Sequence, residues 1–111
     1  MTDWKETLLK TNHKLVDAIK ALEGIGERNL YGIVLVVDSS NKLKGTITDG
    51  DIRRALIEHG DMSVSLNKVM SKNPVTATMD ESEDVIRKKI INNDFLPLPI
   101  LNDKGEIVDI K

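Results

Sequence analysis

The sequence contains no cysteine, which excludes disulfides, thiolate nucleophiles and cysteine-ligated zinc. Aromatic residues make up only 3% of the chain, so leucine, isoleucine and valine must supply nearly all of the core. Neither charge dominates, because 16 basic residues stand against 18 acidic ones and leave a formal charge of -2. This balance argues against a nucleic-acid or membrane-surface role that depends on bulk electrostatics.

Apolar stretches of targeting length are also missing from the start of the sequence. Residues 1–20 carry scattered charges and contain neither the apolar region of a signal peptide nor a membrane span. We therefore expect a cytoplasmic location. The two histidines, His13 and His59, have no partners at metal-ligand spacing, and turn chemistry explains Asp49 and Asp51 as well as a magnesium site does. The sequence predicts no metal centre.

The clearest strand signal is the β-branched apolar run at 33–37, which the turn formers at 38–41 end. Alternation over 43–48 predicts the return strand of a hairpin. A helix is predicted over 51–59, because apolar residues recur at helical spacing and Gly60 is a suitable stop. The second half repeats this order, with a strand at 98–101, a turn at 102–105 and a return strand at 106–110.

A helix is also predicted before each hairpin, over about 14–23 and 82–92. Gly24, Gly26 and Asn29 indicate a loop after the first of these helices. The sequence thus predicts one α/β domain over residues 1–111, with two strand-helix-strand-strand-helix repeats at about 1–62 and 63–111. We expect the second repeat to lack its last helix, because the sequence reaches Lys111 first.

The densest group of functional residues lies at 45–54, where a predicted strand ends and a helix begins. Free amides at a helix N-terminus can receive a phosphate, and Arg53 or Arg54 can add charged donors. A ribose diol can donate its hydroxyls to Asp51, with Thr48 as a second group that reads hydroxyls. The residues alone leave a second interpretation open, in which the carboxylates only cap the helix and the arginines are solvated.

These residues, the turn before them and the repeat together resemble a tandem pair of CBS motifs, also called a Bateman module. In that family a glycine, a Thr or Ser and an Asp mark the ribose-reading turn, here Gly45, Thr48 and Asp51. The segment 70–76 is similar to the start of the family's second motif, which commonly lines an adenine pocket. The resemblance implies a pseudo-twofold module, often a dimer, that binds AMP, ATP or a related adenosyl ligand between its copies. The expected ligand-binding residues are Gly45, Thr48, Asp49, Gly50, Asp51, Arg53, Arg54, Val75 and Thr76.

Two features depart from the family pattern. Asp109 takes the second-copy position of Gly45, and no second Thr-x-x-Asp follows it, so at most one ribose-reading site is complete. Leu35 stands where the second copy has the more typical Pro99.

The string Thr-Asp-Gly-Asp-Ile-Arg-Arg is similar to CBS pairs attached to sugar-phosphate enzymes. We expect a non-catalytic regulatory module, a homodimer, that senses an adenine nucleotide and controls a C-terminal sugar-phosphate nucleotidyltransferase. One alternative is the regulatory pair of an arabinose 5-phosphate isomerase, and another is a dimerisation scaffold that binds no ligand. A third is a phosphatase of the haloacid dehalogenase type, whose nucleophile loop resembles Asp49-Gly50-Asp51 but which needs a parallel sheet.

Overall fold

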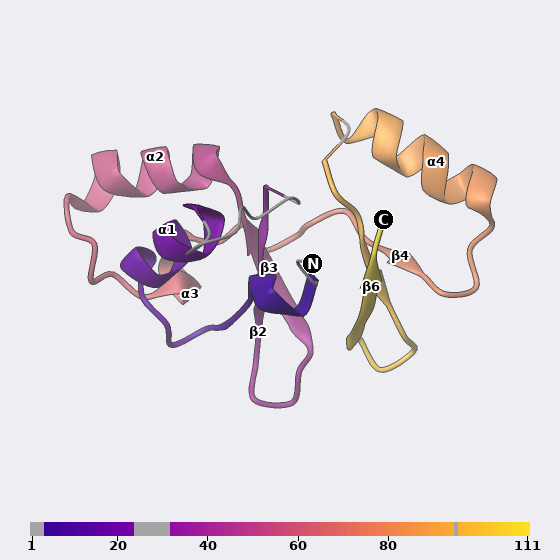
Figure 1. Cartoon of the computed structure of the whole chain (residues 1–111), viewed down its shortest axis with the longest axis horizontal. Coiled ribbons are helices and arrows are strands. Elements are labelled where there is room, and N and C mark those ends of the chain that lie inside the picture. The colour runs from indigo at the N-terminus through magenta and orange to yellow at the C-terminus, as the bar shows by residue number, and fades with distance from the viewer. Residues whose placement is uncertain (1–3, 24–31, 95) are drawn as a thin grey trace.

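The computed structural model describes residues 4–23, 32–94 and 96–111 (Figure 1). The loop expected at Gly24, Gly26 and Asn29 lies outside these residues. In chain order, the described elements are the 3-10 helix η1 (Trp4–Thr7), β1 (Leu8–Lys10), α1 (Leu15–Glu23), β2 (Val34–Val37), β3 (Leu43–Ile47), α2 (Asp49–His59), α3 (Leu66–Val69), β4 (Ala77–Thr78), α4 (Glu83–Asn92), β5 (Pro99–Leu101) and β6 (Ile107–Ile110).

Two three-stranded sheets confirm the predicted repeat. The first has the order β1-β2-β3 and the second β4-β5-β6. In both, the outer strand that comes first in the chain runs parallel to the central strand, and the last strand pairs with it antiparallel. The described sheets are therefore mixed. The phosphatase alternative, which requires a parallel sheet, is wrong.

The central strand β2 has buried side chains on both of its faces. Val34 and Val36 belong to a core that the first sheet shares with the helices α1, α2 and α3. Leu35 and Val37 point the other way and pack in a core with Ile107 and Ile110 of the second sheet. Because neighbouring side chains of a strand point to opposite faces, the apolar run predicted as a buried strand supplies two cores at once.

The resulting layers are helices, sheet, sheet and helix (Figure 1). The helices α1 and α2 lie on the far side of the first sheet, and α4 covers the outer side of the second sheet. Ile86 of α4 packs on Leu98 and Ile100, which form a third, smaller core. The two sheets pack face to face between the helix layers, so residues of both repeats meet in the core between the sheets.

The two hairpin turns have the same internal structure. Oδ1 of Asp38 accepts hydrogen bonds from the amides two and four positions later, at 2.8 and 3.0 Å. Oδ1 of Asn102 accepts from its equivalent amides, both at 2.9 Å. A left-handed residue then follows at the same position, Asn41 with φ 65 and Gly105 with φ 83. The equivalence of the two turns is confirmed.

The predicted helices are present with small shifts at their ends. The helix α2 begins at Asp49, two residues earlier than the apolar spacing predicted, and its C-cap is Gly60, with φ 61. The N-cap of α4 is Ser82, whose hydroxyl accepts the Val85 amide at 3.3 Å. The short helices η1 and α3 were not predicted, since four residues are too few to show a periodicity.

A lysine of α4 ties the second repeat to the segment that links the two repeats. Nζ of Lys89 donates to the Thr76 carbonyl at 2.9 Å and lies 2.8 and 2.7 Å from the two carboxylate oxygens of Glu81. This hydrogen bond and the lysine charge hold the pKa of the Glu81 carboxyl below its usual value. The contribution of the pair to stability is therefore complete above the usual pKa of a glutamate and is lost as the pH falls through the lowered one.

We expect Glu81→Gln to be less stable than the wild type at pH 7 and the difference to close as the pH falls through the lowered pKa of Glu81. Urea unfolding at a series of pH values measures this. Asp103→Asn, which changes an exposed carboxylate in the β5–β6 turn, is the control and should run parallel to the wild type. A difference for Glu81→Gln that is constant across pH would contradict the assignment.

Candidate ligand-binding cleft

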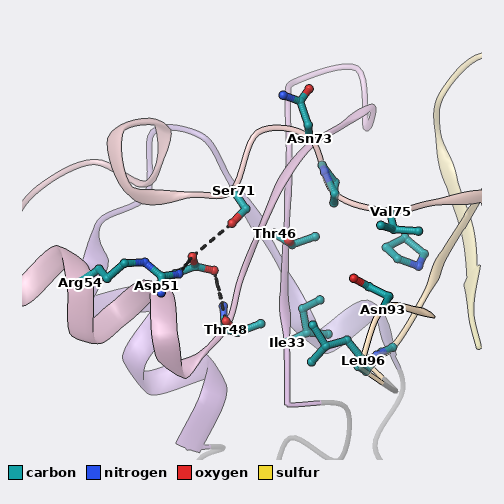
Figure 2. Close-up of a pocket in the computed structure, with 13 residues that line it drawn as sticks. Ile33, Thr46, Thr48, Asp51, Arg54, Ser71, Asn73, Val75, Asn93 and Leu96 are labelled. Atoms are coloured by element: carbon teal, nitrogen blue, oxygen red, sulfur yellow. Dashed lines mark hydrogen bonds and ion pairs between the residues drawn. The ribbon is translucent and has the colours of Figure 1, made fainter. Parts of the chain in front are cut away.

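A cleft of about 290 Å³ opens where the first repeat meets the linker and the second repeat (Figure 2). Such a volume lies near the lower end of the range for small-molecule sites, about 300–1,000 Å³. The lining comes from β3 and the turn into α2, from the linker between the repeats, and from the connection between α4 and β5. Its members are Ile33, Thr46, Thr48, Asp51, Arg54, Ser71, Asn73, Pro74, Val75, Asn93, Leu96, Pro97 and Pro99.

The polar end of the cleft is centred on the carboxylate of Asp51, which is only 7% exposed. Oδ2 accepts from the Thr48 amide at 2.9 Å and from the Thr48 hydroxyl at 3.3 Å. Oδ1 accepts from the Ser71 hydroxyl at 3.1 Å and from Nη2 of Arg54 at 2.5 Å. The buried charge is thus held by four donors, as a buried carboxylate requires.

Two of these donors are fixed by local backbone structure. Thr48 is the N-cap of α2, with extended φ and ψ of -118 and 176, so its amide points back to the first turn of the helix. Ser71 is held by a backbone pair with Thr46, in which the two amide-to-carbonyl distances are 3.1 and 2.9 Å. The linker therefore crosses β3 at the point where its hydroxyl reaches Asp51.

This crossing depends on Gly45. A Cβ at this position would lie 2.7 Å from the Ser71 carbonyl oxygen and 2.7 Å from Cγ and Sδ of Met70. Met70 itself is buried in the core of the first repeat and does not line the cleft. A glycine is needed here because the linker backbone approaches the strand too closely for any side chain.

The other end of the cleft is mainly apolar. Val75 and Leu96 are 41% and 38% exposed, which is high for such side chains, and Figure 2 shows them across the cleft from Asp51. Ile33 forms the floor, and three prolines complete the wall. The side-chain amides of Asn73 and Asn93 are the polar groups at this end. Such a surface suits a flat apolar ring with polar edges.

The structure brings four of the nine predicted residues to the lining: Thr48, Asp51, Arg54 and Val75. The other five do not line the cleft, and each is the neighbour in sequence of a lining residue: Gly45, Asp49, Gly50, Arg53 and Thr76. Gly45 acts by letting the linker approach, and Gly50 leaves room for Arg54, whose Nη1 lies 3.4 Å from where a Cβ would be. The exposed side chains of Asp49 and Arg53 are turned away from Asp51 by their helical positions.

The sequence did not predict the contribution of the α4–β5 connection, which supplies Asn93, Leu96 and Pro97, or of Pro99 at the start of β5 and Ile33. The signal available was the pair of prolines that flank Leu98, a rigid extended segment that lacks backbone donors. Among the described residues, no group of three acidic or histidine side chains is placed to hold a metal ion. The cleft therefore remains the candidate functional site.

Within the described residues, the second repeat shows no equivalent of the polar end. Asp109 stands at the position of Gly45, and its carboxylate accepts the amide of the next residue at 2.8 Å. The described chain reaches its last residue before a turn equivalent to the one from β3 into α2. The Thr-x-x-Asp arrangement therefore occurs once in the described structure.

The CBS domain family matches residues 7–58 and 66–110, which span both repeats, and the chain belongs to this family. CBS domains are regulatory modules without catalytic activity of their own. The protein is thus a tandem CBS pair, a Bateman module, and the resemblance of the sequence to such a pair is confirmed.

Two curated relatives show how far the sequence similarity extends. It is 31% identical over 106 residues to an uncharacterized 17.7 kDa protein from Acidianus ambivalens, covering 96% of this chain and 62% of that protein. It is 38% identical over 87 residues to a protein assigned as arabinose 5-phosphate isomerase in Haemophilus influenzae, covering 71% of this chain and 24% of the isomerase. The chain thus spans less than two thirds of the length of these relatives.

Solved structures share the fold. The CBS pair of a protein assigned to Mg²⁺ transport in Shewanella oneidensis has a TM-score of 0.81 at 21% identity and covers 99% of this chain and 61% of that one. A CBS pair solved with 5′-methylthioadenosine and S-adenosylmethionine has a TM-score of 0.74 at 26% identity, covering 94% and 78%. CBSX2 in complex with AMP gives 0.74 at 18% identity, covering 93% and 78%.

None of the helices in the described ranges combines the length and the apolar character needed to cross a membrane.

Proposed function

We propose that the cleft binds an adenine nucleotide as a regulatory ligand. The observation that carries this proposal is the buried carboxylate of Asp51, which lies at the polar end of a cleft whose opposite end is apolar. A nucleotide has the same division, with a diol and phosphate at one end and a flat base at the other. The CBS pairs solved with S-adenosylmethionine and with AMP support adenosyl compounds as the ligand class.

Each part of the nucleotide has a partner of matching chemistry in this arrangement. The ribose hydroxyls donate to Asp51, beside the Thr48 hydroxyl, and the base lies between Ile33 and Val75. The phosphate lies at the N-terminus of α2, where the first-turn amides of Asp49 and Gly50 have no partner within the helix. The side chains of Arg54 and Arg53, the close approach at Gly45 and the backbone at Thr76 complete the set of proposed site residues.

Calorimetric titration with AMP, ADP, ATP and S-adenosylmethionine tests the proposal. We expect at least one of them to bind in a ratio of one per chain. We expect 2′-deoxy-AMP to bind about tenfold more weakly than AMP, because it lacks one of the hydroxyls that Asp51 would accept. Ribose 5-phosphate, which lacks the base, is the control for the apolar end. If none of the four compounds binds, the alternative of a dimerisation scaffold without ligand replaces the proposal.

Regulation follows from the position of the cleft between the repeats. A ligand that contacts both can favour one arrangement of the repeats, by as much as its affinity differs between the arrangements. We propose that this change controls an attached enzyme that acts on a sugar phosphate. The sequence favours a nucleotidyltransferase as this enzyme, whereas the 38% identity to the Haemophilus influenzae protein favours an arabinose 5-phosphate isomerase. The complete coding sequence decides between them.

A homodimer is part of the proposal. The outer face of α2 exposes Ile57 to 84% and Leu56 to 39%, and the end of α4 exposes Ile91 to 50%. Apolar side chains exposed to this extent on the outer helices are suited to contact a second copy of the chain.

A further inference from the structure

Arg54 already occupies the carboxylate that we propose to bind the ribose. Its Nη2 lies 2.5 Å from Oδ1 of Asp51, and the Ser71 hydroxyl takes a second place on the same oxygen. The amide and hydroxyl of Thr48 take both places on Oδ2. Both oxygens of Asp51 thus hold two donors each, and a ribose hydroxyl must displace one of the four.

The donor that can leave is Arg54. The Thr48 amide is fixed by the helix cap, and the backbone of Ser71 is fixed by its pair with Thr46. The Thr48 hydroxyl makes the longest of the four contacts, at 3.3 Å, and can yield its place to the second ribose hydroxyl. The side chain of Arg54, in contrast, is 67% exposed on the surface of α2. Long side chains in water change rotamer easily, so the ribose displaces this guanidinium at the smallest free-energy cost.

The displaced guanidinium has room on either side. Arg54 lines the cleft and also a small polar cavity of about 90 Å³ farther along α2, beside Glu58 and His59. Over the first turn of the helix, the bare Cα of Gly50 leaves the guanidinium free to swing toward the N-terminus of α2. The movement required is a rotation of one side chain, with no change of backbone.

We propose that Arg54 makes binding in this cleft depend on a phosphate attached to the ribose. The ribose takes the place of the guanidinium on Asp51, and the phosphate then receives the guanidinium, so the ion pair is exchanged and not lost. A nucleoside without a phosphate breaks the ion pair and provides no anion for the guanidinium to pair with. The cleft therefore selects phosphorylated nucleosides over adenosine and over sulfonium compounds such as S-adenosylmethionine. This inference rests on the proposed function, because it assumes that Asp51 binds the ribose.

Titration of AMP and adenosine against the wild type and Arg54→Ala tests the exchange. We expect the wild type to bind AMP at least about tenfold more tightly than adenosine. In Arg54→Ala, AMP should bind about tenfold more weakly, whereas adenosine should bind as well as before or several-fold more tightly. The ratio of the two affinities should fall close to one. Arg54→Gln keeps a neutral donor near Asp51 and should show the same loss of selectivity. This second variant tests the exchange if the alanine variant is poorly folded.

Arg87→Ala is the matched control, since Arg87 is an equally exposed helix arginine that pairs with the aspartate three residues before it, Asp84, and does not line the cleft. It should change neither affinity by more than about twofold. Equal weakening of AMP and adenosine in Arg54→Ala would overturn the exchange while leaving the proposed function intact. An unchanged AMP affinity would also overturn it. Failure of the wild type to bind either compound would overturn the exchange, and it would overturn the proposed function as well only if ADP, ATP and S-adenosylmethionine also fail to bind.

Discussion

Asp51→Ala is expected to lower the affinity for AMP by about 100-fold or more. The reason is that the ribose loses a charged acceptor for two hydroxyls, and each hydrogen bond to a charged group contributes about 1.5–3 kcal/mol. The variant should also lose the preference for AMP over 2′-deoxy-AMP, because no carboxylate remains to distinguish them. Calorimetry with both nucleotides measures the two effects.

The same substitution should lower the free energy of unfolding by about 1–3 kcal/mol, since the Thr48 amide and the Ser71 hydroxyl lose their acceptor. Urea unfolding monitored by circular dichroism shows whether the variant is folded where binding is measured. Asp49→Ala is the control, because Asp49 is exposed in the same turn and touches neither donor. If Asp51→Ala is folded and binds AMP as the wild type does, Asp51 has only a structural role.

Gly45→Ala is expected to destabilise the protein by about 1–3 kcal/mol and to weaken nucleotide binding. The new methyl group would meet the Ser71 carbonyl and the Met70 side chain at 2.7 Å, a separation that real Cβ atoms do not show. Either β3 or the linker must move, and the Ser71 hydroxyl then moves away from Asp51. Urea unfolding and AMP titration of the same variant measure both consequences.

Gly50→Ala is the matched control for this variant. Gly50 is in the first turn of α2, and the nearest atoms to an added methyl group belong to the movable Arg54 side chain, at 3.4 Å. Alanine should be neutral or stabilising there, by up to about 1 kcal/mol. Adding Met70→Ala to Gly45→Ala should restore only part of the lost stability, because the contact with the Ser71 backbone remains. Full stability of Gly45→Ala alone would contradict the close approach.

The repeat architecture could be predicted because both copies use the same local rules. At both turns, the side chain of Asp38 or Asn102 accepts a hydrogen bond from a backbone amide of the same turn. Asp and Asn are typical turn residues for this reason, so the sequence alone indicated both turns. The apolar run that became β2 was long and β-branched enough to indicate a buried strand. The helices α1 and α4 were predicted from helical spacing, and each begins one residue later than predicted.

The cleft could be predicted only in part, because half of it forms through contacts distant in sequence. Thr48 and Asp51 belong to one turn, so their spacing was informative. Asn93 and Leu96 reach the cleft only because α4 packs on Leu98 and so sets where the following connection lies. The role of Ser71 depends on how closely the linker crosses β3, which no local pattern records.

The fold also joins the two repeats away from the cleft. The Leu43 amide donates to the Gly105 carbonyl at 3.1 Å, and Lys42 and Glu106 form an isolated bridge between the tips of the two hairpins. With the core between the sheets, these contacts connect the repeats at one end, and the cleft lies between them at the other. A ligand that draws Asp51 and Leu96 together would act on this joint.

A crystal structure of the chain with AMP tests the central claim most directly. We expect the ribose hydroxyls to lie at hydrogen-bonding distance, about 2.5–3.0 Å, from the Asp51 carboxylate, with the base against Val75 and the Arg54 guanidinium on the phosphate. A nucleotide bound elsewhere on the protein, or one bound in the cleft with its ribose away from Asp51, would contradict it.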